Sequence, residues 1–75
     1  MDDRTVTGRA AAILDAVAAG DPMTLAELTR AVGIPKPTVR RIAADLMSRR
    51  LLARCADGRY RLGVHLLELG VRAAE

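Results

Sequence analysis

"MTLAELTRAVGIPKPTVRRIAADL", residues 23–46, contains two short amphipathic segments separated by a glycine. Thr24 and Glu27 match a capping box, in which the threonine hydroxyl accepts from the Glu27 N–H and the carboxylate accepts from the Thr24 N–H. This pattern predicts a short helix that starts after Thr24. Gly33 is suited to end that helix because glycine readily adopts a positive φ. A second helix begins three residues later, so the stretch predicts a helix-turn-helix.

The second helix is expected from Lys36 or Pro37 to Arg49. Proline is tolerated in the first turn of a helix, where its missing N–H has no partner within the helix. One apolar stripe at helical spacing faces inward and consists of Val39, Ile42, Ala43, Leu46 and Met47. The opposite face is centred on Arg41, with Arg40 to one side. The turn therefore leads into a helix with two adjacent arginines near its start.

A further helix is expected before this stretch, from about Thr7 to Ala19. Its apolar residues recur at helical spacing, and the sequence Gly20-Asp21-Pro22 ends it. The core must be built from aliphatic side chains, because the sequence has no Trp or Phe and one Tyr. A chain of 75 residues corresponds to one small domain near the lower limit for an independent core.

The apolar period changes from helical to two in "LLARCADGRYRLG", residues 51–63. Asp57-Gly58 between two alternating runs is a strong signal of a β-hairpin. A two-residue loop predicts four pairs, which are Cys55 with Tyr60, Arg54 with Arg61, Ala53 with Leu62 and Ala56 with Arg59. The face expected to pack on the helices carries Leu51, Ala53, Cys55, Tyr60 and Leu62. The face expected to form a cationic wing carries Arg54, Arg59 and Arg61.

The last segment, from Val64 to about Ala74, has a helical apolar surface that is wider than one small core needs. Two interpretations remain open: a terminal helix that covers the core, or a helix that leads into another domain or contacts a second subunit. We therefore expect an N-terminal arm at residues 1–6, a winged helix-turn-helix domain at residues 7–62 and a linker helix at residues 63–75.

Charge is distributed unevenly along the chain. Residues 30–61 carry nine basic and two acidic side chains, a net charge of +7, whereas the first 29 residues sum to −3 and the last 14 to −1. A basic middle of this kind is typical of a surface that binds a polyanion. A solvated basic face without a partner would give the same pattern.

Several kinds of site are not predicted. Cys55 is the single cysteine, so it is expected as a small inward-facing apolar side chain rather than in a disulfide or zinc site. His65 has Glu68 at helical spacing, which is more typical of a surface hydrogen bond than of a metal site. No glycine spacing resembles a phosphate-cradling loop, and no apolar run approaches the ~20 residues that span a bilayer. We expect a cytoplasmic protein without enzymatic activity, metal, cofactor or membrane contact.

Together these features predict a mainly α fold with a small β-hairpin: a winged helix-turn-helix of three helices, a two-stranded wing and a C-terminal linker helix. Such a fold places the second helix of its helix-turn-helix in the major groove of duplex DNA. Arg41 and Arg40 would approach base edges, and the wing would reach the backbone or the minor groove. The residues expected to contact DNA are Thr24, Lys36, Pro37, Thr38, Arg40, Arg41, Arg54, Arg59 and Arg61.

The alternative is a winged-helix protein-interaction module whose basic face docks an acidic partner, because a fold alone does not fix a function. A protein interface usually presents large apolar or aromatic anchors. On the outward faces we find only Leu52 and the prolines, which favours DNA.

The run from about residue 8 to residue 70 resembles the N-terminal DNA-binding domain of the IclR family of bacterial transcriptional regulators. The pieces that carry the resemblance are "RAAAILDAV", "MTLAELTRAVGIPKPTVRRIAADL" and "DGRYRLGVHLLELG". The resemblance implies a homodimer that forms through the first and last helices and binds a palindromic or near-palindromic operator in double-stranded DNA. It also implies a C-terminal effector-binding domain outside these 75 residues. A small-molecule effector is expected only if the full-length protein has that domain.

Three positions depart from the pattern that this resemblance implies. The family commonly has a small hydroxyl residue where Pro37 stands, often a histidine where Arg40 stands, and usually a glycine where Arg50 stands. If Arg50 must adopt a left-handed conformation, strain of about 1 kcal/mol is expected.

Overall fold

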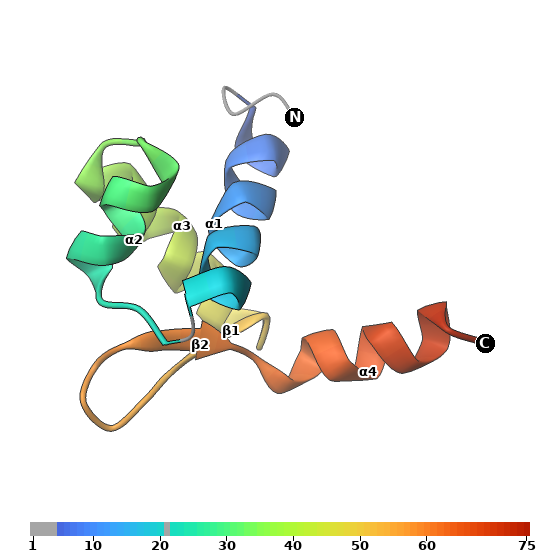
Figure 1. The fold of residues 1–75 in the computed structure, drawn as a ribbon. Coiled ribbons are helices and arrows are strands. Elements are labelled where there is room, and N and C mark those ends of the chain that lie inside the picture. The colour runs from blue at the N-terminus through green and yellow to red at the C-terminus, as the bar shows by residue number, and fades with distance from the viewer. Residues whose placement is uncertain (1–4, 21) are drawn as a thin grey trace.

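The computed structural model describes residues 5–20 and 22–75, and its fold is a winged helix with a fourth helix extending from it (Figure 1). The elements are α1 (Val6–Gly20), α2 (Leu25–Val32), α3 (Lys36–Ser48), β1 (Leu52–Arg54), β2 (Tyr60–Leu62) and α4 (Val64–Ala73). The predicted fold class is therefore confirmed. Two expectations fall outside the described residues: most of the arm at residues 1–6, and Asp21 in the signal that ends the first helix.

The core lies where α1, α2 and α3 meet one face of the hairpin. Its buried side chains are Ile13, Val17, Leu28, Ile34, Val39, Ala43, Leu46, Leu52 and Tyr60. Tyr60 is the largest of them, and it is only 1% exposed. The aliphatic core that the sequence predicted is thus completed by the single tyrosine, which ties the wing to the helices.

The helix-turn-helix follows the local signals closely. The Thr24 hydroxyl accepts from the Glu27 N–H at 3.1 Å, and the Thr24 N–H donates to the Glu27 carboxylate at 2.9 Å. Gly33 ends α2 with φ 68°. By contrast, α3 starts at Lys36, and its N-cap residue Pro35 makes no side-chain cap hydrogen bond.

The register predicted for the hairpin is wrong by one residue. The observed pairs are Leu52 with Leu62, Ala53 with Arg61 and Arg54 with Tyr60. The Gly58 N–H donates to the Cys55 carbonyl, and the Cys55 N–H donates to the Arg59 carbonyl, which leaves a three-residue loop. Gly58 takes φ 87° after this turn, which is the geometry of a three-residue hairpin rather than a two-residue one.

The shifted register exchanges the faces of β1, because neighbouring residues of a strand point to opposite sides. Leu52, expected outside, is 1% exposed in the core. Cys55, expected inside, is only half-buried and lies on the side of Arg59 and Arg61. Arg54, expected on the same face as Arg59 and Arg61, lies on the opposite face and pairs with Tyr60.

An isolated antiparallel β-bridge, which the sequence did not predict, joins Met23 in the loop before α2 to Tyr60 of the wing. The Met23 N–H donates to the Tyr60 carbonyl at 2.9 Å, and the Tyr60 N–H donates to the Met23 carbonyl at 2.6 Å. Since Met23 directly precedes Thr24, this pairing holds the start of α2 against the wing.

α4 does not cover the core, so that interpretation is wrong. None of its residues is buried, and Figure 1 shows it extending away from the other helices. Its position depends on a joint at its first turn, where the Gly63 N–H donates to the Leu51 carbonyl and the His65 N–H donates to the Arg50 carbonyl. Arg50 has φ 60° in this joint, the left-handed conformation that was expected to be strained.

Candidate nucleic-acid interface

The exposed side of α3 carries the predicted contact residues at its start. We call Lys36, Pro37, Thr38, Arg40 and Arg41 the α3 surface. All are exposed except Thr38, which is half-buried. They form two rows, because Lys36, Pro37 and Arg40 line one surface hollow while Thr38 and Arg41 line another. Arg40 and Arg41 therefore look toward different sides of the helix.

The second hollow lies between α3 and the first turn of α1. Besides Thr38 and Arg41 it is lined by Arg9 and Val6 of α1. Sequence reasoning did not single out Arg9, since no local pattern placed the start of α1 beside α3. Arg9 therefore places a second helix beside the α3 surface.

The cations of the α3 surface are not neutralised within the described part of the chain. Lys36, Arg40 and Arg41 form no ion pair with the acidic residues of this part, whereas Arg49 at the end of α3 lies 3.3 Å from the Asp45 carboxylate. Uncompensated charge on an exposed helix attracts an external anion. The positive potential therefore concentrates at the first two turns of α3.

The first turn of α3 offers fewer backbone donors than a helix start usually does. Pro37 has no N–H, and the Thr38 N–H donates to the Pro35 carbonyl at 3.0 Å. Among the described residues, the Lys36 N–H is left as the donor of this turn without a partner. A phosphate here would be held mainly by side chains.

Thr24 lies at the start of α2, beside the wing. Hydrogen bonds from the Thr24 backbone and side chain hold the pKa of the Glu27 carboxyl below its ordinary value, and the Arg59 guanidinium lowers this pKa further. The pairing of Met23 with Tyr60 explains why Arg59 is close enough to act. Within the cap the Thr24 hydroxyl accepts from the Glu27 N–H.

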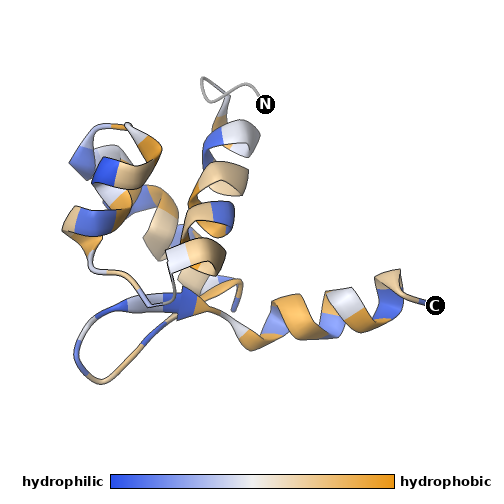
Figure 2. Ribbon diagram, in the orientation of Figure 1, coloured by the Kyte–Doolittle hydropathy of each residue, from blue (hydrophilic) through white to orange (hydrophobic). Residues whose placement is uncertain are grey.

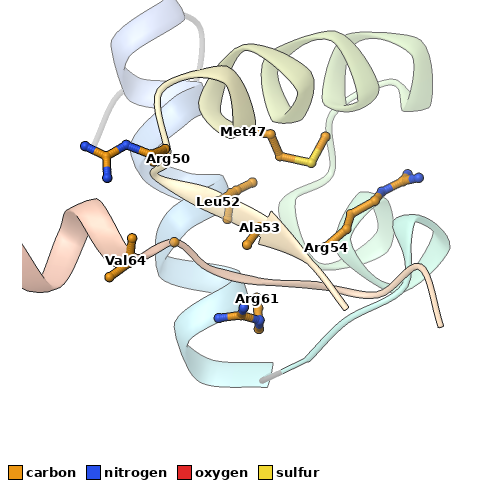
Figure 3. Close-up of a pocket in the computed structure, with 8 residues that line it drawn as sticks. Met47, Arg50, Leu52, Ala53, Arg54, Arg61 and Val64 are labelled. Carbon is orange, nitrogen blue, oxygen red and sulfur yellow. The ribbon is translucent and has the colours of Figure 1, made fainter. Parts of the chain in front are cut away.

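The prediction that the three arginines of the hairpin form one face is wrong. Arg59 and Arg61 share a side, whereas Figure 3 shows the Arg54 and Arg61 side chains pointing away from each other. The Arg54 guanidinium carbon lies 4.7 Å from the centre of the Tyr60 ring, and its Nη2 donates to the tyrosine hydroxyl at 2.7 Å. Arg59 lies 3.7 Å from the Asp57 carboxylate. The wing therefore presents cations in two directions.

Residues 6–55 match the family model of the IclR helix-turn-helix domain. The chain belongs to this family. The match runs from the start of α1 past the end of β1, so it includes α2, α3 and the α3 surface.

Individual IclR-family proteins are similar over the same region. The HTH-type transcriptional regulator KipR of Bacillus subtilis is 40% identical over 53 residues, which are 71% of this chain and 21% of KipR. The repressor BlcR of Agrobacterium tumefaciens is 39% identical with a TM-score of 0.79, over 92% of this chain and 29% of that chain. An IclR transcriptional regulator from Alicyclobacillus acidocaldarius is 29% identical with a TM-score of 0.88, over 93% of this chain and 29% of that chain. The chain thus spans less than a third of these relatives.

The described part of the chain offers little for a metal site or a membrane span. There, no three His, Cys, Asp or Glu side chains gather closely enough to hold a metal ion. Within α4, His65 lies 3.0 Å from the Glu68 carboxylate. None of the helices formed by residues 5–20 and 22–75 is both long and apolar enough to cross a membrane.

Proposed function

We propose that this IclR-family domain binds duplex DNA with sequence specificity, with α3 in the major groove and the arginines of the wing on the backbone or in the minor groove. The observation that carries the proposal is the α3 surface, where Lys36, Arg40 and Arg41 are exposed at the helix start without an ion-pair partner in the described chain. In helix-turn-helix proteins the N-terminal residues of this helix contact base edges.

The roles within the α3 surface follow from side-chain chemistry. Arg41 and Arg40 can form bidentate hydrogen bonds to guanine. Lys36 and Thr38 hold phosphate, and Thr24 does so from the start of α2. Pro37 contributes shape only, since it has neither an N–H nor a hydroxyl. Arg54, Arg59 and Arg61 add backbone contacts.

The full-length protein is proposed to be a homodimeric bacterial transcriptional regulator in the cytoplasm, with residues 63–75 as a linker helix to an effector-binding domain. The exposed large apolar side chains support this arrangement, because they lie on α1, on α4 and at the junction between the wing and α4: Val6, Leu62, Val64, Leu67, Leu69 and Val71. An apolar face of this size on a soluble helix marks a contact with another subunit or domain.

The test is to select binding sites from random duplex DNA and to measure affinity on the selected site and on random duplex. Arg41→Lys keeps the charge and loses the planar fork. We expect it to lower affinity about tenfold on the selected site and little on random duplex. Arg49→Lys is the control, because Arg49 is paired with Asp45. Equal losses on both DNAs would reduce Arg41 to a phosphate contact.

Salt dependence tests the proposal as a whole. If ~4 to 6 phosphates are neutralised per dimer, log affinity should fall with log salt at a slope of roughly −4 to −5. Two half-sites about one helical turn apart would support a dimer. Affinity that does not change with salt would contradict DNA binding. A protein-interaction module would instead be purified without nucleic acid and would bind an acidic protein surface.

A further inference from the structure

We propose that Tyr60 is a positioning residue that holds Arg54 ready to bind a DNA backbone phosphate beside α3. The inference rests on the proposed DNA binding and assigns the two residues different roles. Arg54 makes the contact, whereas Tyr60 stays in the core and acts only through Arg54.

Tyr60 is an unusually fixed anchor for an exposed arginine. Its side chain is 1% exposed, and its backbone pairs with Met23 through two hydrogen bonds of 2.9 and 2.6 Å. Its hydroxyl accepts from Arg54 at 2.7 Å while its ring lies 4.7 Å from the guanidinium carbon. A free arginine side chain loses about 0.5–1.5 kcal/mol of conformational entropy when it is immobilised at an interface. Here the protein fold has already restricted much of that freedom.

The contact with tyrosine leaves the charge of Arg54 available. A guanidinium has five N–H donors, and the tyrosine hydroxyl uses one. The aromatic ring attracts the cation without neutralising it. Arg49, Arg50 and Arg59 each lie within 4.0 Å of a carboxylate, but Arg54 has no such partner in the described residues.

The position of Arg54 fits a phosphate next to the recognition helix. Arg54 and Met47 of α3 line the same surface hollow (Figure 3). Met47 follows Arg40 by seven residues, so both lie on the same side of α3 about 10 Å apart along its axis. A duplex seated on the α3 surface would therefore run its backbone toward Arg54, where the planar fork matches a phosphate.

Two substitutions separate the roles of contact and positioning. Arg54→Ala should weaken binding to selected and random DNA by the same factor and reduce the salt slope by about 0.9 per phosphate lost. Tyr60→Phe removes the hydroxyl and keeps the ring. We expect it to weaken binding about twofold to tenfold, because the freed Arg54 side chain must then lose its conformational entropy on binding. The salt slope should stay unchanged.

A double-mutant cycle tests whether the effect of Tyr60→Phe on affinity depends on Arg54, which a purely structural effect would not. Tyr60→Phe should have no effect on affinity in the Arg54→Ala background. Arg72→Ala, which removes an exposed arginine from α4, controls for the general loss of charge. An equal loss from Tyr60→Phe in both backgrounds, or normal affinity and slope in Arg54→Ala, would overturn the inference. If the unmodified protein bound no duplex at all, the proposed function itself would fail.

Discussion

α3 and α4 are both amphipathic, but they are held in place in different ways. α3 has 13 residues and buries Val39, Ala43 and Leu46 against the rest of the fold. α4 has 10 residues and buries none, although Figure 2 shows much of it in the colour of apolar residues. Packing therefore holds α3 along most of its length, whereas α4 is held only at its first turn. The packing of α3 fits its proposed role in the major groove, and the exposure of α4 fits its proposed role as a linker helix.

The joint at the first turn of α4 is made mostly of backbone. A Cβ on Gly63 would overlap the Arg50 carbonyl oxygen, so only glycine lets these two segments pass so closely. The side chain of Arg50 adds a contact of 3.5 Å to Glu68, which also lies 3.0 Å from His65. These few contacts set the direction of α4.

The largest expected difference comes from the same substitution in the two helices. Leu46 is 6% exposed and Leu67 is 68% exposed. Leu46→Ala should lower the free energy of unfolding by about 2–5 kcal/mol, since it opens a cavity in the core. Leu67→Ala should change it by no more than about 0.5 kcal/mol. Urea denaturation followed by circular dichroism measures both. Comparable losses would show that α4 packs on the domain in solution.

Alanine substitutions at two glycines, one at the joint and one within α4, should change stability in opposite directions. Gly63→Ala should destabilise the domain by about 1–3 kcal/mol or displace α4, because the new methyl group meets backbone that cannot rotate away. Gly70 lies in α4, and the methyl group of an alanine there would have no neighbouring atom within 4 Å, so Gly70→Ala should stabilise the helix by about 0.5–1 kcal/mol. Thermal unfolding and hydrogen exchange of the α4 amides distinguish the outcomes. A neutral Gly63→Ala with unchanged exchange would contradict the close approach.

A smaller effect is expected at Arg50, where strain and a side-chain contact oppose each other. Arg50→Gly relieves the left-handed conformation and loses the exposed pair with Glu68, so the domain should gain up to about 1 kcal/mol. Arg50→Ala keeps the strain and loses the pair, so its effect should be a slight loss. Chemical denaturation of the two variants tests this order. If both lost stability equally, the φ of Arg50 would carry no strain.

The sequence predicted the helix-turn-helix nearly to the residue and the hairpin only in outline. The capping box at Thr24, Gly33 and the prolines around Lys36 are local signals, so they act wherever the chain lies. Asp57-Gly58 is compatible with both a two-residue and a three-residue loop. The choice between them was made by distant groups, the core around Tyr60 and the partner Met23, which no local pattern contains.

The candidate site shows the same division. The exposure of Arg40 and Arg41 followed from helical period alone, and the structure agrees. The side taken by Arg54 depended on the register and was predicted wrongly. The direction of α4 could not be predicted, because it follows from one close approach between Gly63 and Arg50.

The smallest expected effect is a shift in the titration of two exposed carboxyls, one in the cap of α2 and one in the joint of α4. The pKa of Glu68 is held below its ordinary value of 4.5 by the hydrogen bond with His65 and then by the charge of Arg50. The pKa of Glu68 is lower in the folded state than in the unfolded state. The ionised carboxylate therefore stabilises the fold fully above the unfolded pKa, and this stabilisation is lost as pH falls through the folded pKa. The window therefore lies below pH 4.5, for Glu27 in the cap as well. Added salt should narrow this pH window, because both carboxyls are exposed and salt screens their attraction to the nearby arginines.

Arg50→Gly separates the two carboxyls. It should move the pKa of Glu68 toward 4.5 without restoring it fully, because the hydrogen bond with His65 remains. The pKa of Glu27 should stay where it is, since its causes lie at Thr24 and Arg59. Carboxyl carbon shifts followed by NMR between pH 2 and 7, a range set by the ordinary carboxyl values, measure both. A parallel shift at Glu27 would mean that Arg50 supports the whole domain rather than the joint alone, and α4 would then share the cooperative unit to which α3 belongs.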